Sequence, residues 1–511
     1  MDNKETSELS RKEGGRHNDQ LRLEALLAHQ GRLLPDEAQR QAFRRTALYP
    51  PPACLRLNDL HGSTALLAPF LGARATAVPW CAQAYVVEDL DEPLGTSLEH
   101  LLGAFYIQAK ATTLAVESLA PLPGEKILDM AASPGGKATQ IAARMQNSGL
   151  LVVNEPQPKR HPALAGNLKR CGVSNAVLSR APGTLMARFF HNYFDRILLD
   201  APCSGDGIVR KNRAMLRYWS VDDARRLAQR QTGLLRAAFH MLRPGGTLVY
   251  STCSLSTEEN EDVVAGLLHK YPDQVEILPV EGIDRPPLPP DIAAVYPADF
   301  SRCARVWPHL HDTEGAFVAT LRKRGTTSWN KWEGDAANWQ PAPTAAVEVA
   351  IAQLEQRWQF ALPRTPDQIL VSQGRHLSLR PRLAQALQEN YPYYGGSGLH
   401  MARLHKSHYY LSQAAAVAWG PHIGARRLQL EWPQVQCLFH HAALSLPRPT
   451  ALRGEVLCAY GPWILCRGLV DGNGRNLKAM LPRELRQAKL STLTGPPLFP
   501  AHKDCHAPIY Q

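Results

Sequence analysis

The sequence predicts an α/β protein built on a mainly parallel, doubly wound sheet. Short apolar runs alternate with stretches of helical periodicity through the middle of the chain, and strands that alternate with helices form parallel sheets. Two of those runs, 197–199 and 247–250, each end in a polar loop that carries a cysteine. Because ligands bind beyond the carboxyl ends of such strands, we expect Asp200, Cys203 and Cys253 to face one cleft.

The length and composition of the chain set limits on its class. With 511 residues it is too long for one core, so two to four domains are expected. The net charge of +11 favours a polyanionic partner such as nucleic acid, although a basic, solvated surface is the alternative. No apolar run is long enough to span a membrane. The ten cysteines form no CxxC pair, which favours a reducing cytoplasm and argues against a metal cluster or a disulfide framework.

The N-terminal part predicts a tail followed by a small module. Residues 1–18 are polar and are expected to be disordered, and residues 19–93 are expected to form an α+β module. A run of prolines at 50–52 would stop its first helix. The expected elements are a helix over 20–48, strands over 54–58 and 83–87, and a helix over 63–71.

A tight loop of small residues follows the first strand of the main sheet, at 125–130. The glycines of such a loop let the backbone approach a ligand, and the helix that follows offers free N–H groups. The spacing matches neither GxGxxG nor GxxxxGKS, so neither a dinucleotide nor a triphosphate site is well supported. The loop consists of Ala131, Ala132, Ser133, Pro134, Gly135, Gly136 and Lys137.

An acidic residue ends the second strand of the same sheet. Residues 150–153 are apolar and run into Asn154 and Glu155. A carboxylate there can accept hydrogen bonds from a ribose diol, although an ordinary strand-end acid is the alternative when the position is taken alone. Further alternation predicts helices over 161–171 and 224–242 and strands over 176–178 and 316–321.

Beyond the main sheet the chain predicts a linker and two further regions. Residues 326–345 are expected to be the linker, 346–440 a mixed α/β region, and 441–511 a β-rich domain. Aromatic residues lie among basic ones between 391 and 410. Such a pattern can stack bases and bind phosphates, or it can be core aromatics beside surface charge, and the stretch alone does not separate the two.

The motifs resemble those of the Sun/Fmu-type (Nol/Nop/Sun) RNA (cytosine-5) methyltransferases, in particular the subgroup that acts on bacterial 16S ribosomal RNA. The resemblance covers about residues 95–325 and implies a Rossmann-like class I S-adenosylmethionine-dependent methyltransferase core over 94–325. It also implies that the N-terminal module binds RNA, that the C-terminal region does so too and includes a PUA-like domain, and that the partner is 16S rRNA or the small ribosomal subunit. The matching segments are GAFYIQ, ILDMAASPGGKATQIAARM, FDRILLDAPCSGDG, LRPGGTLVYSTCSLSTEENE and HDTEGAFVATLRK.

The resemblance also implies roles for the residues of the cleft. Cytosine C5 is a poor nucleophile, and a thiolate added at C6 makes it reactive, which is covalent catalysis. Cys253 matches the nucleophile of the family, Asp200 the residue that hydrogen-bonds or protonates N3, and Cys203 the residue that helps release the product. The base that removes the C5 proton is not identified, and water or Cys203 could serve.

For the cofactor, the resemblance places S-adenosylmethionine on the loop from Ala131 to Lys137. Glu155 would hold the ribose hydroxyls, and Arg160 and Asp200 would also line the site. One position departs from the family, because Pro182 stands where an Asp usually contacts the adenine amino group. Proline supplies neither a carboxylate nor an N–H there, so one cofactor contact is in doubt.

Three other functions remain open from the sequence. The chain could methylate transfer RNA, or it could be a degenerate methyltransferase that binds RNA during ribosome assembly, which Pro182 would favour. A small-molecule methyltransferase explains neither the two cysteines nor the basic flanking regions. DNA methyltransferases use the cysteine that corresponds to Cys203 as nucleophile, and the second cysteine favours RNA.

Overall fold

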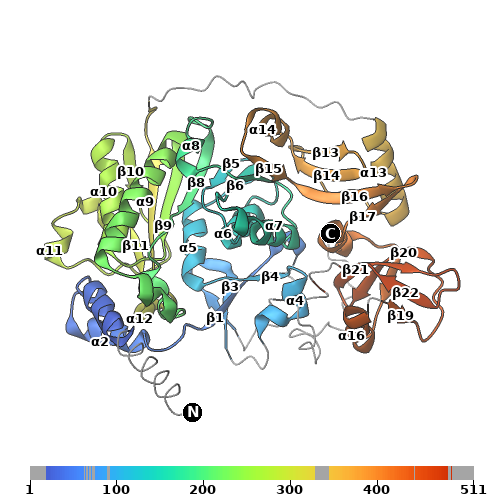
Figure 1. The fold of residues 1–511 in the computed structure, drawn as a ribbon, viewed down its shortest axis with the longest axis horizontal. Helices are drawn as coiled ribbons and strands as arrows, with labels where there is room; N and C mark the ends of the chain where they lie inside the picture. Colours follow the sequence, from blue (N-terminus) through green and yellow to red (C-terminus); the bar gives the residue numbers. More distant parts are fainter. Residues whose placement is uncertain are drawn as a thin grey trace, which may run out of the picture.

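The computed structural model describes residues 19–62, 64, 67, 71, 75–88, 93–327, 345–441, 443–481 and 485. The expected N-terminal tail and most of the expected linker lie outside these residues, as does most of the expected 63–71 helix. The centre of the molecule is a nine-stranded sheet with the order β10-β12-β9-β8-β5-β6-β7-β15, and β11 pairs with β12 (Figure 1). The strands are β5 Lys126–Asp129, β6 Leu150–Asn154, β7 Ala176–Ser179, β8 Phe194–Asp200, β9 Leu242–Thr252, β10 Val275–Leu278, β11 Ala304–Val306, β12 Ala316–Lys323 and β15 Tyr394–Ser397.

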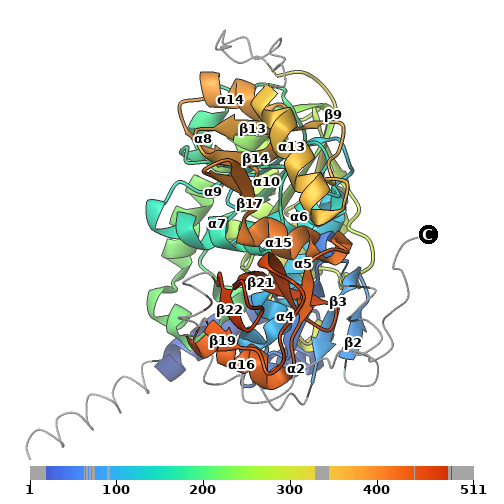
Figure 2. The ribbon, with the colours of Figure 1, turned by 90° about the vertical axis from the view of Figure 1, so that its right-hand side faces the viewer.

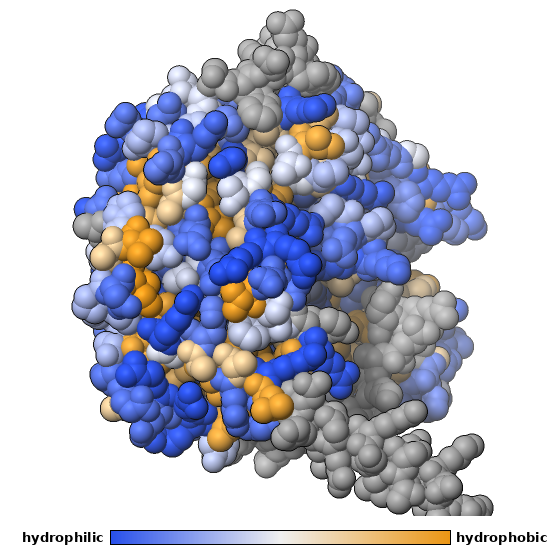
Figure 3. Space-filling model, turned by 60° about the vertical axis from the view of Figure 1, so that its left-hand side comes forward, coloured by the Kyte–Doolittle hydropathy of each residue, from blue (hydrophilic) through white to orange (hydrophobic). Residues whose placement is uncertain are grey.

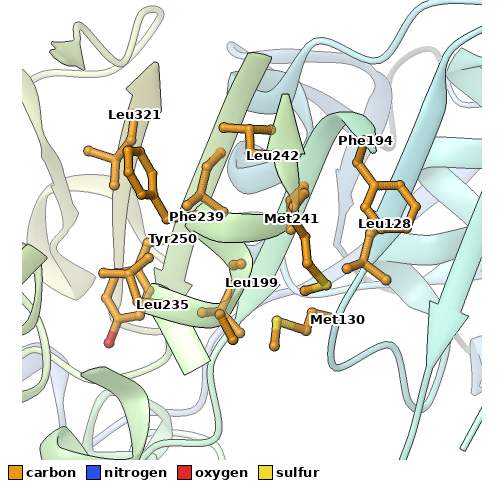
Figure 4. Packing of buried hydrophobic residues seen from close by; sticks show 14 of the residues in the cluster. Leu128, Met130, Phe194, Leu199, Leu235, Phe239, Met241, Leu242, Tyr250 and Leu321 are labelled. Atoms are coloured by element: carbon orange, nitrogen blue, oxygen red, sulfur yellow. The ribbon is translucent and has the colours of Figure 1, made fainter. Parts of the chain in front are cut away.

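The inner strands of this sheet are parallel and helices cover both faces, so the predicted doubly wound fold is confirmed. β9, β8, β5, β6 and β7 are parallel neighbours, while β10, β12 and β15 add antiparallel edges. One face packs against α5 Lys110–Leu119, α6 Gly136–Arg144 and α7 His161–Arg170. The other packs against α8 Gly183–Met186, α9 Val221–Met241 and α10 Glu261–Lys270. Figure 4 shows Leu235 and Phe239 of α9 packing beside Leu199 and Tyr250 of the sheet.

The N-terminal module is a four-stranded antiparallel sheet with helical segments before it. Its strands are β1 Ala53–Leu57, β2 Ala75–Val78, β3 Cys81–Val87 and β4 Phe105–Ile107, in the order β2-β3-β1-β4. The expectation of one helix over 20–48 was wrong, because the chain turns between a helical segment at 19–31 and α2 Glu37–Thr46. Pro35 disfavours helix in the residue before it, and the Asp36 side chain caps α2 by accepting from the Gln39 N–H at 2.8 Å.

The C-terminal part contains two further sheets and returns to the central one. α13 Ala345–Trp358 packs on β13 Gln368–Gln373, β14 His376–Pro381, β16 Leu399–His405 and β17 His408–Leu411. Between β14 and β16, α14 Ala384–Asn390 and β15 leave this sheet, and β15 joins the edge of the central sheet at β7. After α15 Gln413–Trp419 comes a sheet of β18 Arg427–Gln429, β20 Gly454–Tyr460, β21 Trp463–Val470, β22 Asn476–Ala479 and β19 Ala443–Ser445, with α16 Trp432–His441. In Figure 2 these elements extend from α14 at the top to α16 at the bottom.

The parts of the molecule share hydrophobic cores. Leu387 and Tyr391 of the C-terminal part belong to the main core between the central sheet and α9. Leu57 and Phe105 of the N-terminal sheet share a second core with Trp463 and other residues of the last sheet. The C-terminal part is therefore packed into both of the preceding units.

The surface is mostly hydrophilic on the side that carries α2, α10 and α11 Pro290–Ala293 (Figure 3). Hydrophilic residues dominate this face, and hydrophobic residues lie on it in small groups (Figure 3). Across the residues that the structure describes, no helix is both long and apolar enough to cross a membrane. Within the same residues, no group of three or more His, Cys, Asp and Glu side chains could hold a metal ion.

Candidate active site

The two cysteines lie side by side at the carboxyl edge of the central sheet. Cys203 follows β8 and Cys253 follows β9, and these strands are parallel neighbours. Their Sγ atoms are 3.1 Å apart although the residues are 50 positions apart in the chain. The hydrogen bond to Cys253, together with burial, raises the pKa of the Cys203 thiol well above its ordinary value. Cys203 therefore keeps its proton, and its thiol can act as a hydrogen-bond donor toward the Cys253 sulfur.

A carboxylate from the first cysteine loop holds the second loop. The buried Asp206 side chain accepts from the Leu255 N–H at 2.7 Å and from the hydroxyls of Ser254 and Ser256. The Gly207 N–H donates to the Cys253 carbonyl oxygen at 2.9 Å. A Cβ on Gly207 would stand only 2.7 Å from that oxygen, so glycine is needed for this close approach.

A carboxylate from the second loop holds the first one in return. The fully buried Glu259 side chain accepts from the Ser204 N–H at 2.9 Å, from the Ser204 hydroxyl and from Gln231 Nε2 at 2.8 Å. Burial raises the pKa of Glu259, although these donors oppose the rise. Asp206 and Glu259 thus brace the two cysteine loops reciprocally, which fixes the separation of the sulfur atoms.

Asp200, at the end of β8, lies between the cysteines and the small-residue loop. Its Oδ1 accepts from the Ser251 hydroxyl at 2.8 Å and its Oδ2 pairs with Lys137 Nζ at 2.7 Å. Burial alone would lower the pKa of Lys137, but the charge of Asp200, the hydrogen bond to it and the nearby charge of Asp129 together outweigh burial, so the net pKa is raised. Lys137 therefore remains a cation in the cleft.

A second carboxyl, Asp129, is buried behind the same loop. It is 1% exposed, and no side chain among the described residues donates a hydrogen bond to it, although the Ala131 backbone N–H lies close enough to favour its charged form. Burial, followed by the nearby charge of Asp200, raises the pKa of Asp129 to about 7. A buried acceptor of this kind is costly unless something donates to it, so the cleft suits a ligand that carries a donor or a positive charge.

The predicted small-residue loop connects β5 to α6 and is supported from the N-terminal module. Gly135 adopts a φ of +111°, which side chains rarely allow, and it lies immediately before α6. Behind it, the buried Arg56 of β1 donates to the Gly136 carbonyl oxygen at 3.3 Å and to Thr139 Oγ1 at 2.9 Å. Gln108 accepts from Arg56 Nε at 2.9 Å. The loop thus rests on a module that precedes it in the sequence.

Glu155 and Arg160 lie together at the end of β6. Glu155 is buried, and its carboxylate lies 3.3 Å from the Arg160 guanidinium. Arg160 also donates to the Ser133 carbonyl oxygen at 2.7 Å, which ties this strand end to the loop. The adjacent Pro182 is exposed and forms the N-cap of α8, where no side-chain hydrogen bond is made. All the candidate residues thus lie along the ends of β5, β6, β7, β8 and β9.

Several residues of the site were not anticipated. Asp206 and Glu259 lie inside the motifs, and only the three-dimensional pairing reveals that they brace the loops. Arg56 lies in the predicted 54–58 strand, within the module for which the resemblance implies RNA binding. Tyr391 lies in the aromatic run whose role was open, and it is buried in the main core with 4% exposure. No local pattern in the sequence marks these contacts.

A doubly wound sheet with a small-residue loop after its first strand and neighbouring cysteines beyond the ends of two others fits a methyltransferase, and comparison with known proteins shows that class. Residues 116–322 match the model of the 16S rRNA methyltransferase RsmB/F family. Residues 24–110 match the N-terminal domain of 16S rRNA methyltransferase RsmF.

Curated relatives place the chain more narrowly. It is 34% identical over 486 residues to ribosomal RNA small subunit methyltransferase F of Erwinia tasmaniensis, which covers 92% of this chain and 98% of that protein. It is 42% identical over 306 residues to the protein of the same name in an Enterobacter species, covering 58% of this chain and 62% of the relative. The chain therefore belongs to the ribosomal RNA small subunit methyltransferase F family.

Solved structures resemble the central part of the chain. A methyltransferase homologue from Pyrococcus horikoshii is 31% identical with a TM-score of 0.52, and the match covers 58% of this chain and 93% of that one. NSun6 from the same organism, solved with the ligand SFG, has a TM-score of 0.51 and 22% identity over 58% of this chain and 97% of its own. The second likeness concerns the fold alone.

Proposed function

We propose that this protein transfers a methyl group from S-adenosylmethionine to C5 of a cytosine in small-subunit (16S) ribosomal RNA. The observation that carries the proposal is the pair of sulfur atoms 3.1 Å apart at the carboxyl edge of the sheet. The names of the family model and of the relatives support ribosomal RNA as the substrate. A cytosine within a stacked helix hides C6 from a side chain, so the target base would have to be flipped into the cleft.

The cleft residues fit the cofactor. S-adenosylmethionine supplies an electrophilic methyl group on a positively charged sulfonium. The loop from Ala131 to Lys137 would hold its methionine part and sugar, with Glu155 on the ribose hydroxyls and Arg160 and Asp200 lining the site. The buried Asp129 carboxyl, to which no side chain of the described residues donates, supports a ligand with a donor or a positive charge.

In this mechanism Cys253 is the nucleophile and Cys203 the proton carrier. The Cys253 thiolate adds to C6, and the electrons of the C5–C6 double bond become available at C5 for the methyl group. Asp200 would hydrogen-bond or protonate N3 as negative charge develops on the ring. A base, for which water or Cys203 could serve, then takes the C5 proton, the C5–C6 double bond re-forms, the Cys253 sulfur leaves, and any proton on N3 returns to Asp200. The raised pKa of Cys203 means that its thiol is protonated before the reaction and can hydrogen-bond to the departing sulfur.

The test is methyl transfer with tritiated S-adenosylmethionine, using small-subunit RNA that lacks the modification. Wild type is expected to yield labelled 5-methylcytosine, and Cys253→Ala is expected to yield none. A Cys253→Ala enzyme that methylates at the normal rate would contradict the nucleophile assignment. Parallel reactions with purified small subunits and with bulk transfer RNA identify the substrate. RNA binding without any label would favour a scaffold that has lost activity.

A further inference from the structure

The edge of the central sheet is formed by a strand from the C-terminal part of the chain. β15 pairs antiparallel with β7, with Tyr394 opposite Ser179 and Ser397 opposite Val177. The Arg180 N–H donates to the Tyr393 carbonyl oxygen at 3.0 Å, which continues the pairing past the end of β7. The C-terminal strand therefore reaches the point where β7 enters the cofactor cleft.

A buried chain of hydrogen bonds begins at Tyr391, just before β15. The Tyr391 hydroxyl lies 2.8 Å from Ser179 Oγ, which lies 2.7 Å from Asn154 Oδ1. Ser179 has one hydroxyl proton and gives it to Asn154, so the Tyr391 hydroxyl must donate to Ser179. Ser179 and Asn154 are fully buried and Tyr391 nearly so, which shields the chain from water.

The chain of hydrogen bonds ends at Asn154, which contacts two backbone segments beside the cofactor cleft. Asn154 Nδ2 donates to the carbonyl oxygens of Met130, at 3.2 Å, and of Ala181, at 3.1 Å. Its Oδ1 also accepts from the Ala181 N–H at 3.1 Å. Met130 leads directly into the loop that begins at Ala131, and Ala181 directly precedes Pro182. The Asn154 side chain thus sets the distance between the loop after β5 and the segment at 181–182, where Pro182 replaces the aspartate of the family.

The ring and the hydroxyl of Tyr391 make separable contacts. The ring packs against Phe189 and Phe190, with centroids 5.3 and 4.9 Å away. A phenylalanine would keep these contacts and lose only the hydrogen bond to Ser179. Tyr394 offers a matched control, because its hydroxyl pairs with Ser397 Oγ at 2.6 Å and lies outside the chain that leads to Asn154.

We propose that Tyr391 is a positioning residue of the cofactor site, through which the C-terminal part of the protein contributes to binding of the methyl donor as well as to the fold. The inference depends on the proposed use of S-adenosylmethionine. Pro182 supplies no carboxylate to the cofactor site. The C-terminal part would therefore help to position the site at the point where the family usually has an aspartate. The buried hydrogen bonds from Tyr391 through Ser179 to Asn154 connect the C-terminal part to the cofactor site.

The test is calorimetric titration of S-adenosylmethionine into full-length wild type, Tyr391→Phe and Tyr394→Phe. The loss of one buried hydrogen bond in Tyr391→Phe is expected to raise Kd about three- to tenfold. Tyr394→Phe is expected to bind like wild type. RNA affinity of Tyr391→Phe, measured by filter binding, is expected to stay at the wild-type value, because the change is confined to the cofactor side.

The route through Ser179 is tested by a double-mutant cycle. In a Ser179→Ala background, Tyr391→Phe is expected to have no further effect on Kd, because the intermediate hydroxyl is already absent. Equal Kd values for wild type and Tyr391→Phe would overturn the inference. An equal loss of cofactor and RNA affinity would also overturn it, since that result means general loosening. If wild type itself does not bind S-adenosylmethionine, the proposed cofactor is wrong instead.

Discussion

The two halves of the cleft are held in different ways. On the cysteine side, Asp206 and Glu259 brace the loops after β8 and β9, and both belong to the same two motifs that supply the cysteines. On the cofactor side, the loop after β5 rests on Arg56 of the N-terminal module. The end of β7 is tied to Tyr391 of the C-terminal part, more than 200 positions away.

This difference separates the chemical step from the binding of the methyl donor. The braces of the cysteine side come from the central domain itself, and helical segments of the N-terminal module pack behind them on Val209 and Leu255. The cofactor side is completed by both flanking parts, so its geometry depends on how the whole chain packs. Changes on the first side are therefore expected to affect turnover, and changes on the second side are expected to affect cofactor affinity.

Apart from the loss of Cys253 itself, the largest expected effect is on the cysteine side, in Cys203→Ala. Without the Cys203 proton the Cys253 sulfur is a poor leaving group, so the adduct with RNA is expected to persist and turnover to fall about a thousandfold or more. A protein–RNA band that survives denaturing electrophoresis measures it. The double variant Cys203→Ala/Cys253→Ala is the control and should give no band. Normal turnover by Cys203→Ala would exclude the role of Cys203 in release.

The brace itself is tested by Glu259→Gln. The amide can accept fewer hydrogen bonds than the carboxylate and turns an N–H toward Ser204 or Gln231, so kcat is expected to fall about 10- to 100-fold with the cofactor Kd unchanged. Glu258→Gln is the matched control, because Glu258 pairs with His29 and Arg32 and not with the cysteine loops. Equal kcat values for the two variants would refute the bracing role of Glu259.

The residues that line both sides of the cleft could be named from the sequence, but the contacts that hold them in place could not. Asp200, Cys203 and Cys253 follow short apolar runs, and parallel strands bring such ends together. Nothing local marks Tyr391, because whether a tyrosine among basic residues stacks on RNA or enters a core depends on the tertiary pairing of β15 with β7. The split near Pro35 was missed because helical periodicity continues on both sides of it.

On the cofactor side, Arg56→Met is expected to have an intermediate effect. The substitution keeps the buried volume and removes the donors to Gly136 and Thr139, so the loop loses support and the Kd for S-adenosylmethionine is expected to rise about tenfold. Calorimetry measures the Kd, and kcat at saturating cofactor should stay near the wild-type value. Arg40→Met, in α2 of the same module, removes contacts only to Glu37 and Leu34 and serves as control. A fall in kcat with an unchanged Kd would mean that Arg56 supports the chemical step and not cofactor binding, which would contradict this prediction.

The smallest expected effect is a gain, in Pro182→Asp. Pro182 is exposed at the N-cap of α8 with a φ of −56°, which aspartate also adopts, and aspartate is a favourable N-cap residue. The new carboxylate would restore an acceptor for the adenine amino group, and the Kd for S-adenosylmethionine is expected to fall about threefold. Pro182→Ala removes the same ring without adding an acceptor and should not tighten binding. An equal gain in both variants would mean that the proline ring, and not the missing carboxylate, weakens the site. No gain in either variant would mean that a carboxylate at position 182 does not reach the adenine amino group.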